Sequence, residues 1–490
     1  MSWPKNPLIY EINTWIWLQE LGGRYNRRVT LANIPTQEYD YLARAGYDAV
    51  WLMGVWERSP VGIAIARYHT IIAKELKAAL PDYTDSDLVG SPYCIRRYRI
   101  EAQLGGNKGL AIARRELARR GIRLILDFVP NHVAPDHPWT SEHPEYFIVG
   151  TEKELSDHPE DYLESNNSIF ARARDPFFPP WPDVLQLNVF HPGLREALKA
   201  TIREIAGMCD GVRCDMAMLD TNEIFLKTWG KKAGPVPEEN LWKLLIPEAV
   251  KVHSGFIFIG EVYWDMEWEM MQQGFDYCYD KRLYDRLLEG TPESVRQHLT
   301  ADVSYQSRLL RFLENHDEPR AAALEPVDRH MALAVAVLTL PGIRLLHDGQ
   351  RDGRKVKVPV FLGRRQHEVT DNELSSFYER LLGLLKSEVI RNGGWSPCEV
   401  TGWPENQSYR NILAWEWVNE EVRALIIINL SDQPAQCHIR PGRPYDASHA
   451  YQLFDALSGE LYTRDGNEMN DPGLFAGLQP WGAHTFIIEH

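Results

Sequence analysis

Apolar and polar positions along residues 1–390 alternate in a way that predicts strands separated by helices. Apolar residues recur every three or four positions within 110–117 and 194–205, as on the buried face of a helix. Short apolar runs typical of buried strands lie at 8–12, 49–54, 124–129, 211–215, 256–260, 275–279, 310–313 and 342–346. Strands that alternate with helices form a parallel sheet, and eight such units predict an α/β fold, a (β/α)8 TIM barrel.

Two connections are longer than the usual links of a barrel. Residues 62–92 follow the second strand and combine a helical run with a polar loop, and residues 133–189 follow the third strand. Loops of this length usually form an active-site lid or a subdomain. We therefore predict an inserted subdomain at 133–189, between the barrel segments 1–132 and 190–390.

The pattern changes after residue 390. Asn392-Gly393-Gly394 interrupts the chain, and apolar residues then alternate with polar ones at 412–418, 423–430, 450–454 and 484–488. This period of two, with turn signals such as Asp465-Gly466, predicts antiparallel strands. We predict that residues 391–490 form a C-terminal antiparallel β domain, a β-sandwich.

Composition narrows the range of partners. The 490 residues carry a formal net charge of −15, which argues against nucleic acid as a partner. The most apolar run, 331–340, is too short to span a bilayer and the N-terminal residues lack a secretory pattern, so we expect a cytoplasmic protein without a membrane partner. The 6 cysteines show no CxxC spacing, so neither a zinc site nor a disulfide framework is expected.

Charged residues follow the predicted strands at the end where barrel enzymes carry their chemistry. Arg213 and Asp215 are two residues apart on one strand, so their side chains share a face. A neighbouring guanidinium favours the ionised carboxylate, which suits a nucleophile. A surface ion pair would give the same pattern, and three other stretches bear on this choice.

Those stretches also place polar residues after predicted strands: 127–132 at the third, Glu261 after the fifth and 314–317 after the seventh. Glu261 follows the apolar run 256–259, and such surroundings raise the pKa of a carboxyl so that it can act as a general acid. Each stretch alone also fits a buried polar residue, a helix cap or a loop histidine. Together they favour cleavage of glycosidic bonds by two carboxylates of different pKa.

These stretches resemble the four signature regions of the α-amylase superfamily of glycoside hydrolases, in the same order along the chain. The matching segments are Asp127-Phe-Val-Pro-Asn131-His132, Gly211-Val-Arg213-Cys-Asp215, Gly260-Glu261-Val262 and Glu314-Asn315-His316-Asp317. Trp181-Pro182-Asp183-Val184 resembles a further region near the end of the insertion, and Tyr93 matches a tyrosine that stacks on the sugar. The resemblance covers the barrel and the insertion and extends to the C-terminal domain.

The resemblance implies a role for each matching residue. Asp215 would be the nucleophile, Glu261 the acid/base, and Asp317 would bind substrate hydroxyls and stabilise the transition state. Arg213 would keep Asp215 ionised, and Asp127 would support the Arg213 side. The residues implied to grip the sugar at the cleavage point are Tyr93, His132 and His316.

The resemblance also implies a structural calcium ion, although the chemistry requires no cofactor. Asn131 and Asp183 match calcium ligands of many family members, and both offer the oxygen atoms that calcium prefers. His137 lies near His132 in the sequence, but its place beside a proline indicates a loop histidine and not a metal ligand.

Departures from the family pattern concern the part of the substrate that leaves. Met218 and Leu219 stand where a Lys-His pair is common, Glu318 where an asparagine is common, and Cys94 where an aspartate is common. Methionine donates no hydrogen bond, so we expect a weak or apolar grip on the sugar beyond the cleavage point. This predicts a preference for short substrates or chain ends.

The sequence therefore predicts a retaining hydrolase of α-glucosidic bonds in α-glucans or short α-gluco-oligosaccharides, with a carbohydrate as its partner. An α-glucosyl or maltosyl transferase, or an isomerase, would use the same covalent glycosyl-aspartate and is the alternative. A non-catalytic binding relative would lose catalytic carboxylates, and all three are present. A phosphate-binding barrel lacks support, because no glycine-rich phosphate loop follows the seventh or eighth strand.

Overall fold

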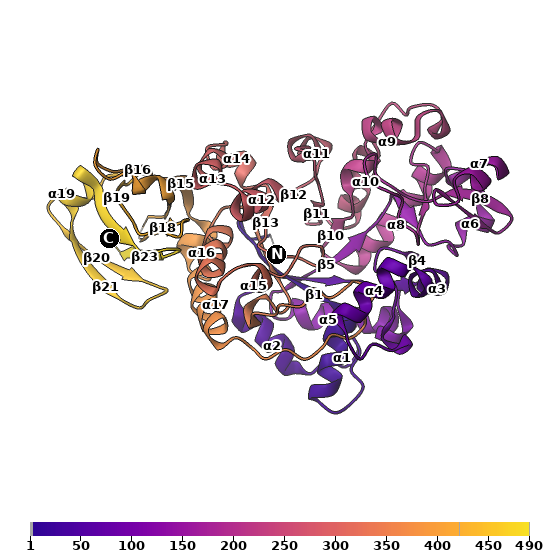
Figure 1. Cartoon of the computed structure of the whole chain (residues 1–490), viewed down its shortest axis with the longest axis horizontal. Helices are drawn as coiled ribbons and strands as arrows, with labels where there is room; N and C mark the ends of the chain where they lie inside the picture. The colour runs from indigo at the N-terminus through magenta and orange to yellow at the C-terminus, as the bar shows by residue number, and fades with distance from the viewer. Residues whose placement is uncertain (1–2, 421, 490) are drawn as a thin grey trace.

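Eight parallel strands close into a barrel in the computed structural model, which describes residues 3–420 and 422–489 (Figure 1). Around the barrel the strands follow the order β1-β14-β13-β12-β11-β10-β5-β2. Their bounds are Leu8–Asn13 (β1), Ala49–Met53 (β2), Arg123–Phe128 (β5), Gly211–Cys214 (β10), Ile257–Gly260 (β11), Tyr277–Tyr279 (β12), Leu309–Arg311 (β13) and Ile343–His347 (β14). The predicted barrel is confirmed, and no predicted strand end lies more than two residues from the observed one.

Side chains alternate along each strand between the barrel interior and the surrounding helices. The interior is filled by bulky apolar side chains, among them Ile9, Trp51, Ile125, Ile259, Leu310 and Leu345. Three charged residues, Glu11, Asp127 and Arg213, are buried with them near the carboxyl ends of their strands. A charge in such a place requires a partner, and these partners form the candidate site described below.

Helices cover the outside of the barrel. α5 (Gly106–Ala118) and α8 (Pro192–Met208) bury the apolar faces that predicted them, and Gly121 adopts a positive φ of 76° in the turn after α5. The other helices in the links between barrel strands, outside the two long insertions, are α1 (Thr14–Arg24), α2 (Thr36–Ala45), α9 (Asn222–Trp229), α10 (Leu241–Val252), α11 (Glu267–Gln273), α12 (Lys281–Glu289), α13 (Pro292–His298), α14 (Val303–Gln306), α15 (Ala321–Leu324) and α16 (Val327–Leu338). Two more helices, α17 (Asn372–Leu385) and α18 (Glu388–Asn392), follow the last barrel strand, β14. Within the described residues, no helix is both long enough and apolar enough to cross a bilayer.

The two long links carry small structures of their own. The link after β2 holds α3 (Pro60–Tyr68), α4 (Thr70–Ala79) and a ribbon of β3 (Trp56–Arg58) with β4 (Ile95–Ile100), so it contains two helices where one helical run was predicted. The link after β5 holds β6 (His132–Val133), α6 (Trp139–Glu142), α7 (Glu152–Asp157), β7 (Tyr162–Ser165), β8 (Ser168–Ala171) and β9 (Leu185–Gln186). β6 pairs with β9, which returns the end of this insertion to the carboxyl end of β5.

The C-terminal part folds into two antiparallel sheets, as Figure 1 shows at the end of the chain opposite the insertion. The larger sheet has the order β15-β17-β18-β23-β20-β21 and the smaller one β16-β19-β22. The strand bounds are Gly394–Pro397 (β15), Glu399–Thr401 (β16), Ile412–Val418 (β17), Val422–Asn429 (β18), Ala435–Arg440 (β19), Ala450–Asp455 (β20), Leu461–Asp465 (β21), Leu474–Leu478 (β22) and Ala483–Glu489 (β23). The sequence predicted β17, β18, β20 and β23, and it missed the shorter or less apolar strands.

Candidate active site

Three carboxylates converge around one arginine at the carboxyl end of the barrel. Asp215 directly follows β10, Glu261 directly follows β11, and Asp317 lies beyond β13. Arg213 places Nη1 2.6 Å from Asp215 Oδ1 and Nη2 2.8 Å from Glu261 Oε2. Nη2 also lies 3.9 Å from Asp317 Oδ2. The structure thus brings together the four residues to which the family resemblance assigns the chemistry.

Arg213 lies in a closed aromatic environment. Its side chain is 1% exposed, and its Nε donates a hydrogen bond to the Tyr279 hydroxyl at 3.2 Å. The rings of Trp51, Tyr93 and Tyr279 have their centroids within 5.8 Å of the guanidinium carbon. Burial disfavours the charged form, but the neighbouring Glu261, tyrosines and Asp215 raise the pKa of Arg213 well above its ordinary value, so it is a permanent cation.

Glu261 is buried and accepts two hydrogen bonds. The Met216 backbone N–H donates to Oε2 at 2.7 Å, and the Tyr263 hydroxyl donates to Oε1 at 2.9 Å. Burial raises the pKa of Glu261 to about 7, against the effect of Arg213 and with the support of Asp215. Glu261 is therefore protonated in part near neutral pH, as a general acid requires. Tyr263 was not predicted to contact Glu261, although its position two residues after Glu261 in the sequence indicated that the two side chains could meet.

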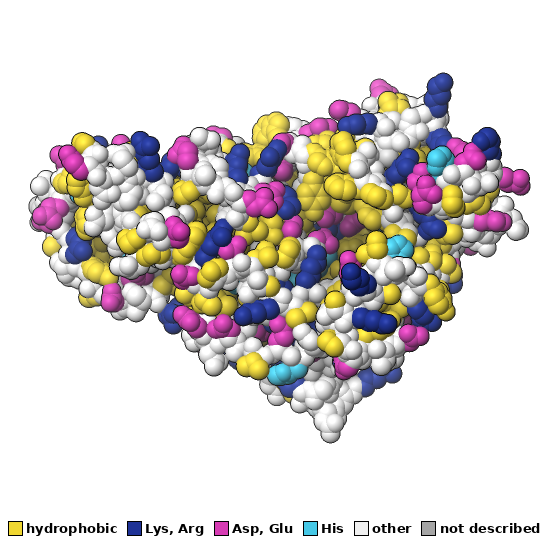
Figure 2. Space-filling view, viewed as in Figure 1, with side chains coloured by type: hydrophobic (Ala, Val, Ile, Leu, Met, Phe, Trp, Pro, Cys, Tyr) yellow, Lys and Arg dark blue, Asp and Glu magenta, His cyan; other side chains and the backbone are white. Residues whose placement is uncertain are grey.

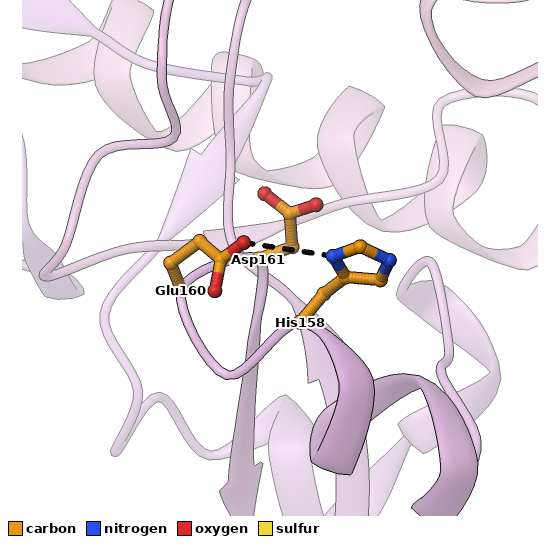
Figure 3. A group of neighbouring side chains, drawn as sticks. All are labelled: His158, Glu160 and Asp161. Carbon is orange, nitrogen blue, oxygen red and sulfur yellow. Dashed lines mark ion pairs between the residues drawn. The ribbon is translucent and has the colours of Figure 1, made fainter.

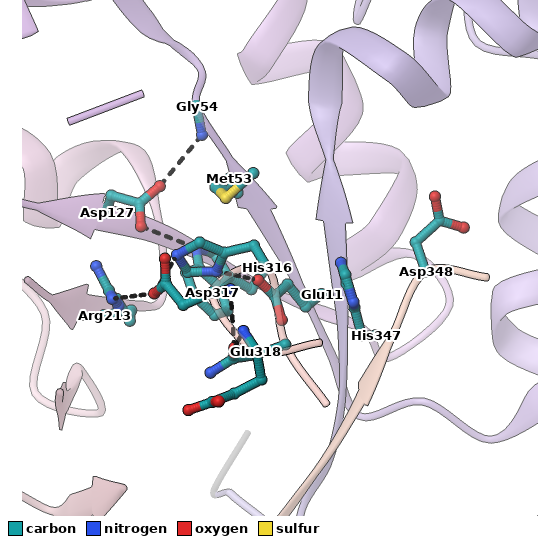
Figure 4. A network of polar contacts seen from close by, with 12 residues as sticks. Glu11, Met53, Gly54, Asp127, Arg213, His316, Asp317, Glu318, His347 and Asp348 are labelled. Atoms are coloured by element: carbon teal, nitrogen blue, oxygen red, sulfur yellow. Dashed lines mark hydrogen bonds and ion pairs between the residues drawn. The ribbon is translucent and has the colours of Figure 1, made fainter. Parts of the chain in front are cut away.

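His316 links Asp317 to a buried glutamate, Glu11, that was not predicted from the sequence (Figure 4). His316 Nδ1 lies 2.5 Å from Glu11 Oε1, and Nε2 lies 2.8 Å from Asp317 Oδ2. Burial disfavours the imidazolium, but Asp317 and Glu11 raise the pKa of His316 to about 10. Burial likewise opposes ionisation of Asp317, and the charges of His316 and Arg213 nevertheless hold its pKa well below the usual range. Asp317, whose side chain is 44% exposed, therefore presents an ionised carboxylate.

Asp127 supports Arg213 through a tryptophan. Its Oδ1 accepts a hydrogen bond from Trp51 Nε1 at 3.1 Å, and its Oδ2 accepts one from the Gly54 backbone at 3.2 Å. The Trp51 ring in turn lies 5.4 Å from the Arg213 guanidinium. Burial raises the pKa of Asp127 to about 6, which the charge of Arg213 opposes. Asp127 thus orients the wall against which the arginine packs.

The remaining residues implied to grip the sugar lie around the same centre. The Tyr93 hydroxyl is 2.6 Å from His316 Nε2, and His132 Nε2 is 3.9 Å from Asp215 Oδ2. Burial lowers the pKa of His132, so this ring is neutral and can donate or accept a hydrogen bond from a sugar hydroxyl. The Trp181 ring lies 5.3 Å from the His132 ring. The inserted segment therefore closes the site from one side.

Met218 does not face this site, which corrects the reason given for a weak grip beyond the cleavage point. Met218 and Leu219 lie in a 3-10 turn, Ala217–Asp220, and both are buried in the hydrophobic core. The preceding residue, Met216, has a positive φ of 42°, which turns the chain so that Met216 and not Met218 borders the cleft. The preference for short substrates or chain ends therefore loses its premise.

The two calcium ligands that the resemblance implies, Asn131 and Asp183, are both buried. Asn131 Oδ1 accepts a hydrogen bond from Gln186 Nε2 at 2.8 Å. The Asp183 backbone carbonyl accepts a bond from the Cys94 thiol at 3.0 Å, and burial raises the pKa of the Asp183 carboxyl to about 6. Within the described residues, Asp183 Oδ2 and Gln186 Oε1 are buried oxygens without a hydrogen-bond partner. Calcium takes about six to eight oxygen ligands, so the calcium site stays a prediction.

Among the described residues, one group of histidine and carboxylate side chains has the spacing of a metal site. His158, Glu160 and Asp161 hold their ligand atoms within 4.8 Å of one another on the inserted segment (Figure 3). His158 and Glu160 are exposed, and Asp161 pairs with Arg174 at 3.4 Å. Surface groups of this kind are common without a metal, and this one lies outside the carboxylate centre. His137 is buried against Trp139 and is not part of the group formed by His158, Glu160 and Asp161.

A buried arginine that faces two carboxyl groups at the carboxyl end of a barrel, with the pKa of one of them raised to about 7, is an arrangement that suits a glycoside hydrolase or a transferase of the same type. Figure 2 shows a hollow over the ends of β10 and β11, with acidic side chains within it and hydrophobic ones along its edge. Residues 31–178 match the family model for the α-amylase catalytic domain.

Relatives and solved structures agree with this match. The α-amylase MalA of Haloarcula japonica is 24% identical over 459 residues, covering 90% of this chain and 58% of MalA. The trehalose synthase/amylase TreS of Mycobacterium tuberculosis is 31% identical over 154 residues, 28% of this chain and 25% of TreS. The maltogenic α-amylase AmyB of Thermotoga neapolitana shares the fold, with a TM-score of 0.71 over 99% of both chains at 19% identity. The chain is therefore similar to members of the α-amylase superfamily, and it spans little more than half the length of MalA.

Proposed function

We propose that this protein is a retaining hydrolase of α-glucosidic bonds in α-glucans or short α-gluco-oligosaccharides. The observation that carries the proposal is the arrangement around Arg213, where one guanidinium faces both Asp215 and Glu261 while burial raises the pKa of Glu261 to about 7. Two carboxyl groups that face one arginine, one of them with a pKa raised by burial, suit a double displacement. The six cysteines are free thiols, which supports a cytoplasmic location.

In the proposed reaction Asp215 attacks the anomeric carbon while Glu261 gives its proton to the glycosidic oxygen. The bond from the anomeric carbon to that oxygen breaks, and the leaving group departs as an alcohol. Water then attacks the glycosyl ester of Asp215 and passes a proton to Glu261, which releases a sugar with its original anomeric configuration. Such enzymes hold the two carboxyls about 5–5.5 Å apart, against roughly 6.5–9.5 Å for inverting enzymes.

A transferase or isomerase that uses the same glycosyl ester is the second candidate. The similarity to TreS, a trehalose synthase/amylase, supports it, because a sugar hydroxyl would replace water in the second step. Both candidates share the first step and the roles of Asp215 and Glu261. They differ in the acceptor alone, so product analysis with maltose as the substrate separates them.

Variants of the two carboxylates test the proposal. Glu261→Gln should slow cleavage of maltose by on the order of 10²–10⁴-fold, since general acid catalysis contributes about this much, and should spare the first step with α-glucosyl fluoride, whose leaving group needs little protonation. Asp215→Asn should abolish the first step with both substrates. Equal losses with both substrates in Glu261→Gln, or an inverted first product by proton NMR, would contradict the assignment.

A further inference from the structure

A pocket of about 810 Å³ lies beside the ribbon of β3 and β4 and next to α1. Its volume is in the range of sites that hold a small organic molecule. None of the described residues that line it belongs to the carboxylate centre around Arg213. The pocket is therefore a candidate binding site of its own.

Arg58, on β3, is a buried cation in the lining of this pocket. It is 7% exposed, and its Nη2 donates a hydrogen bond to the Gly54 carbonyl at 3.1 Å. Its Nε and Nη1 have no hydrogen-bond partner among the described residues. Burial lowers the pKa of Arg58 to about 10, which Asp127 opposes, so the guanidinium stays charged near neutral pH. A buried charge of this kind is costly until it meets a partner.

The lining has donors without partners but no such acceptors. Trp15 Nε1 also lines the pocket and is buried without a hydrogen-bond partner within the described part of the chain. In contrast, no buried side-chain oxygen of the described lining residues lacks a partner. A ligand that completes these hydrogen bonds must therefore bring acceptor atoms.

The carboxylates of the lining are already engaged. They are Glu57, paired with Arg96 at 2.6 Å, Asp85, paired with Arg67 at 3.3 Å, and Glu101, which accepts two backbone hydrogen bonds. The other two cations of the lining, Arg58 and the exposed Arg99, have no carboxylate partner among the described residues. The charges left without a partner therefore favour an anionic ligand.

Apolar side chains form another part of the wall and indicate the rest of the ligand. They are Ile63, Leu88 and Val89, together with the ring of Trp15. An inorganic ion would leave this apolar surface uncovered, whereas an organic group would bury it. A phosphate group suits the donors, because it offers three strong acceptor oxygens and forms charge-assisted hydrogen bonds with a guanidinium.

The Gly54 peptide joins the pocket to the catalytic centre. Its carbonyl accepts the bond from Arg58, and its N–H donates to Asp127 Oδ2 at 3.2 Å (Figure 4). Asp127 in turn accepts a hydrogen bond from Trp51, whose ring packs against Arg213. A ligand on Arg58 would therefore lie one peptide away from this network without entering the cleft.

We propose that this pocket binds the phosphate ester of a small organic molecule, with the phosphate on Arg58 and the organic part against Trp15 and its apolar neighbours. The inference goes beyond the proposed function, because hydrolysis of an α-glucosidic bond neither consumes nor releases a phosphate ester. The ligand is thus an effector that binds beside the substrate and not in its place.

The test measures binding of glucose 6-phosphate, AMP, inorganic phosphate and citrate to the full chain by calorimetry and by thermal unfolding. At a hundredfold excess over its Kd, a bound ester should raise Tm by about 3 °C. Glucose 6-phosphate and AMP distinguish a sugar from a nucleoside as the organic part, and the tighter of the two should bind better than inorganic phosphate or citrate. Saturating maltose should not displace it.

Arg58→Met should weaken binding at least about tenfold, because hydrogen bonds to a charged group are lost. Without ligand this variant should not lower Tm, since it removes an unpaired buried charge. Arg99→Met changes an exposed residue, so the fold is preserved, and it should weaken binding about two- to fivefold. Arg97→Met is the matched control, because Arg97 also lies on β4 but does not line the pocket, and it should leave Kd unchanged.

The inference would be overturned if neither ester bound the wild type, or if Kd were the same in Arg58→Met and Arg99→Met as in the wild type. Binding of inorganic phosphate or citrate as tight as that of the esters would overturn the assigned class of ligand. Displacement by maltose would place the ester in the catalytic cleft and would overturn the separate site.

Discussion

Replacing Glu11 with glutamine removes one charge from the chain Glu11–His316–Asp317 and preserves its shape. Glu11 is fully buried, and its Oε1 lies 2.5 Å from His316 Nδ1. The amide oxygen of glutamine can still accept the hydrogen bond from Nδ1, so the ring keeps its orientation. The imidazolium loses one of the two carboxylates that stabilise it, and Asp317 remains.

The size of the effect follows from this geometry. A contact ion pair contributes roughly 4 kcal/mol at the effective dielectric of such sites, and one pKa unit corresponds to about 1.4 kcal/mol. The pKa of His316, about 10 in the wild type, should therefore fall by about two to three units. A histidine whose pKa is raised by folding adds to the free energy of unfolding in full below its unfolded pKa of 6.5, and this contribution is lost as pH rises through about 10. Glu11→Gln should therefore lower the free energy of unfolding most below pH 6.5. The difference should vanish above pH 10.

The assay is the pH dependence of α-glucosyl fluoride cleavage, which depends little on the proton of Glu261. Wild type should keep its first-step rate until the pH approaches 10, and Glu11→Gln should lose it as pH rises through about 7–8. Denaturant unfolding at pH 6 and pH 10 measures the stability difference. Glu314→Gln is the matched control, because Glu314 is also fully buried but pairs with Arg320 at 2.5 Å. The reasoning would be refuted if the loss of fluoride cleavage at high pH occurred at the same pH in Glu11→Gln as in the wild type. It would also be refuted if Glu314→Gln shifted that pH equally.

Three further predictions concern titration and metal binding. The rate of maltose hydrolysis should fall as pH rises through about 7, where Glu261 loses its proton, while the rate of α-glucosyl fluoride cleavage should not. A fall of both rates at the same pH would contradict this. Asp220 is fully buried, and neither of its carboxyl oxygens has a hydrogen-bond partner among the described residues. Burial raises the pKa of Asp220 well above the ordinary value. Its contribution to the free energy of unfolding therefore falls as pH rises above about 4. Asp220→Asn should flatten the decline of unfolding free energy between pH 4 and 8, and an unchanged slope would count against it. A chelator should lower Tm and added calcium should restore it, because Asp183 Oδ2 and Gln186 Oε1 are buried oxygens without hydrogen-bond partners in the described structure. A Tm that neither treatment moves would remove the predicted calcium site.

The barrel could be predicted from the sequence because its eight strands are buried on both faces and form continuous apolar runs. The same regularity predicted where the candidate site lies, since Asp215 and Glu261 follow two such runs and the ends of parallel strands meet at one rim. The strands of the smaller C-terminal sheet were missed, because β19 buries small residues, Ala435 and Cys437, between polar ones. The apolar signal of β19 is too weak to separate it from a loop.

Contacts between distant residues could not be predicted in the same way. Glu11 and His316 are 305 positions apart, and a glutamate inside an apolar strand was the one local sign that a buried cation faced it. The orientation of Met218 was misjudged for a different reason. It depends on the positive φ of Met216, and methionine gives no indication of such a conformation.

The charge balance of the site explains how one carboxyl can act as an acid and then as a base. Two cations, Arg213 and His316, face five buried or partly buried carboxyl groups. Because negative charges outnumber positive ones, burial favours a proton on some of these groups. The pKa of Glu261, about 7, shows that Glu261 is protonated in part near neutral pH. The five are Glu11, Asp127, Asp215, Glu261 and Asp317. In the proposed reaction Asp215 would become neutral on forming the glycosyl ester, and the charge of Arg213, 2.8 Å from Glu261 Oε2, would no longer be shared with it. The loss of a neighbouring anion and the undivided guanidinium both lower the pKa of Glu261 in the intermediate. Glu261 is then ionised when water or a sugar hydroxyl arrives, and it accepts the proton that the second step releases.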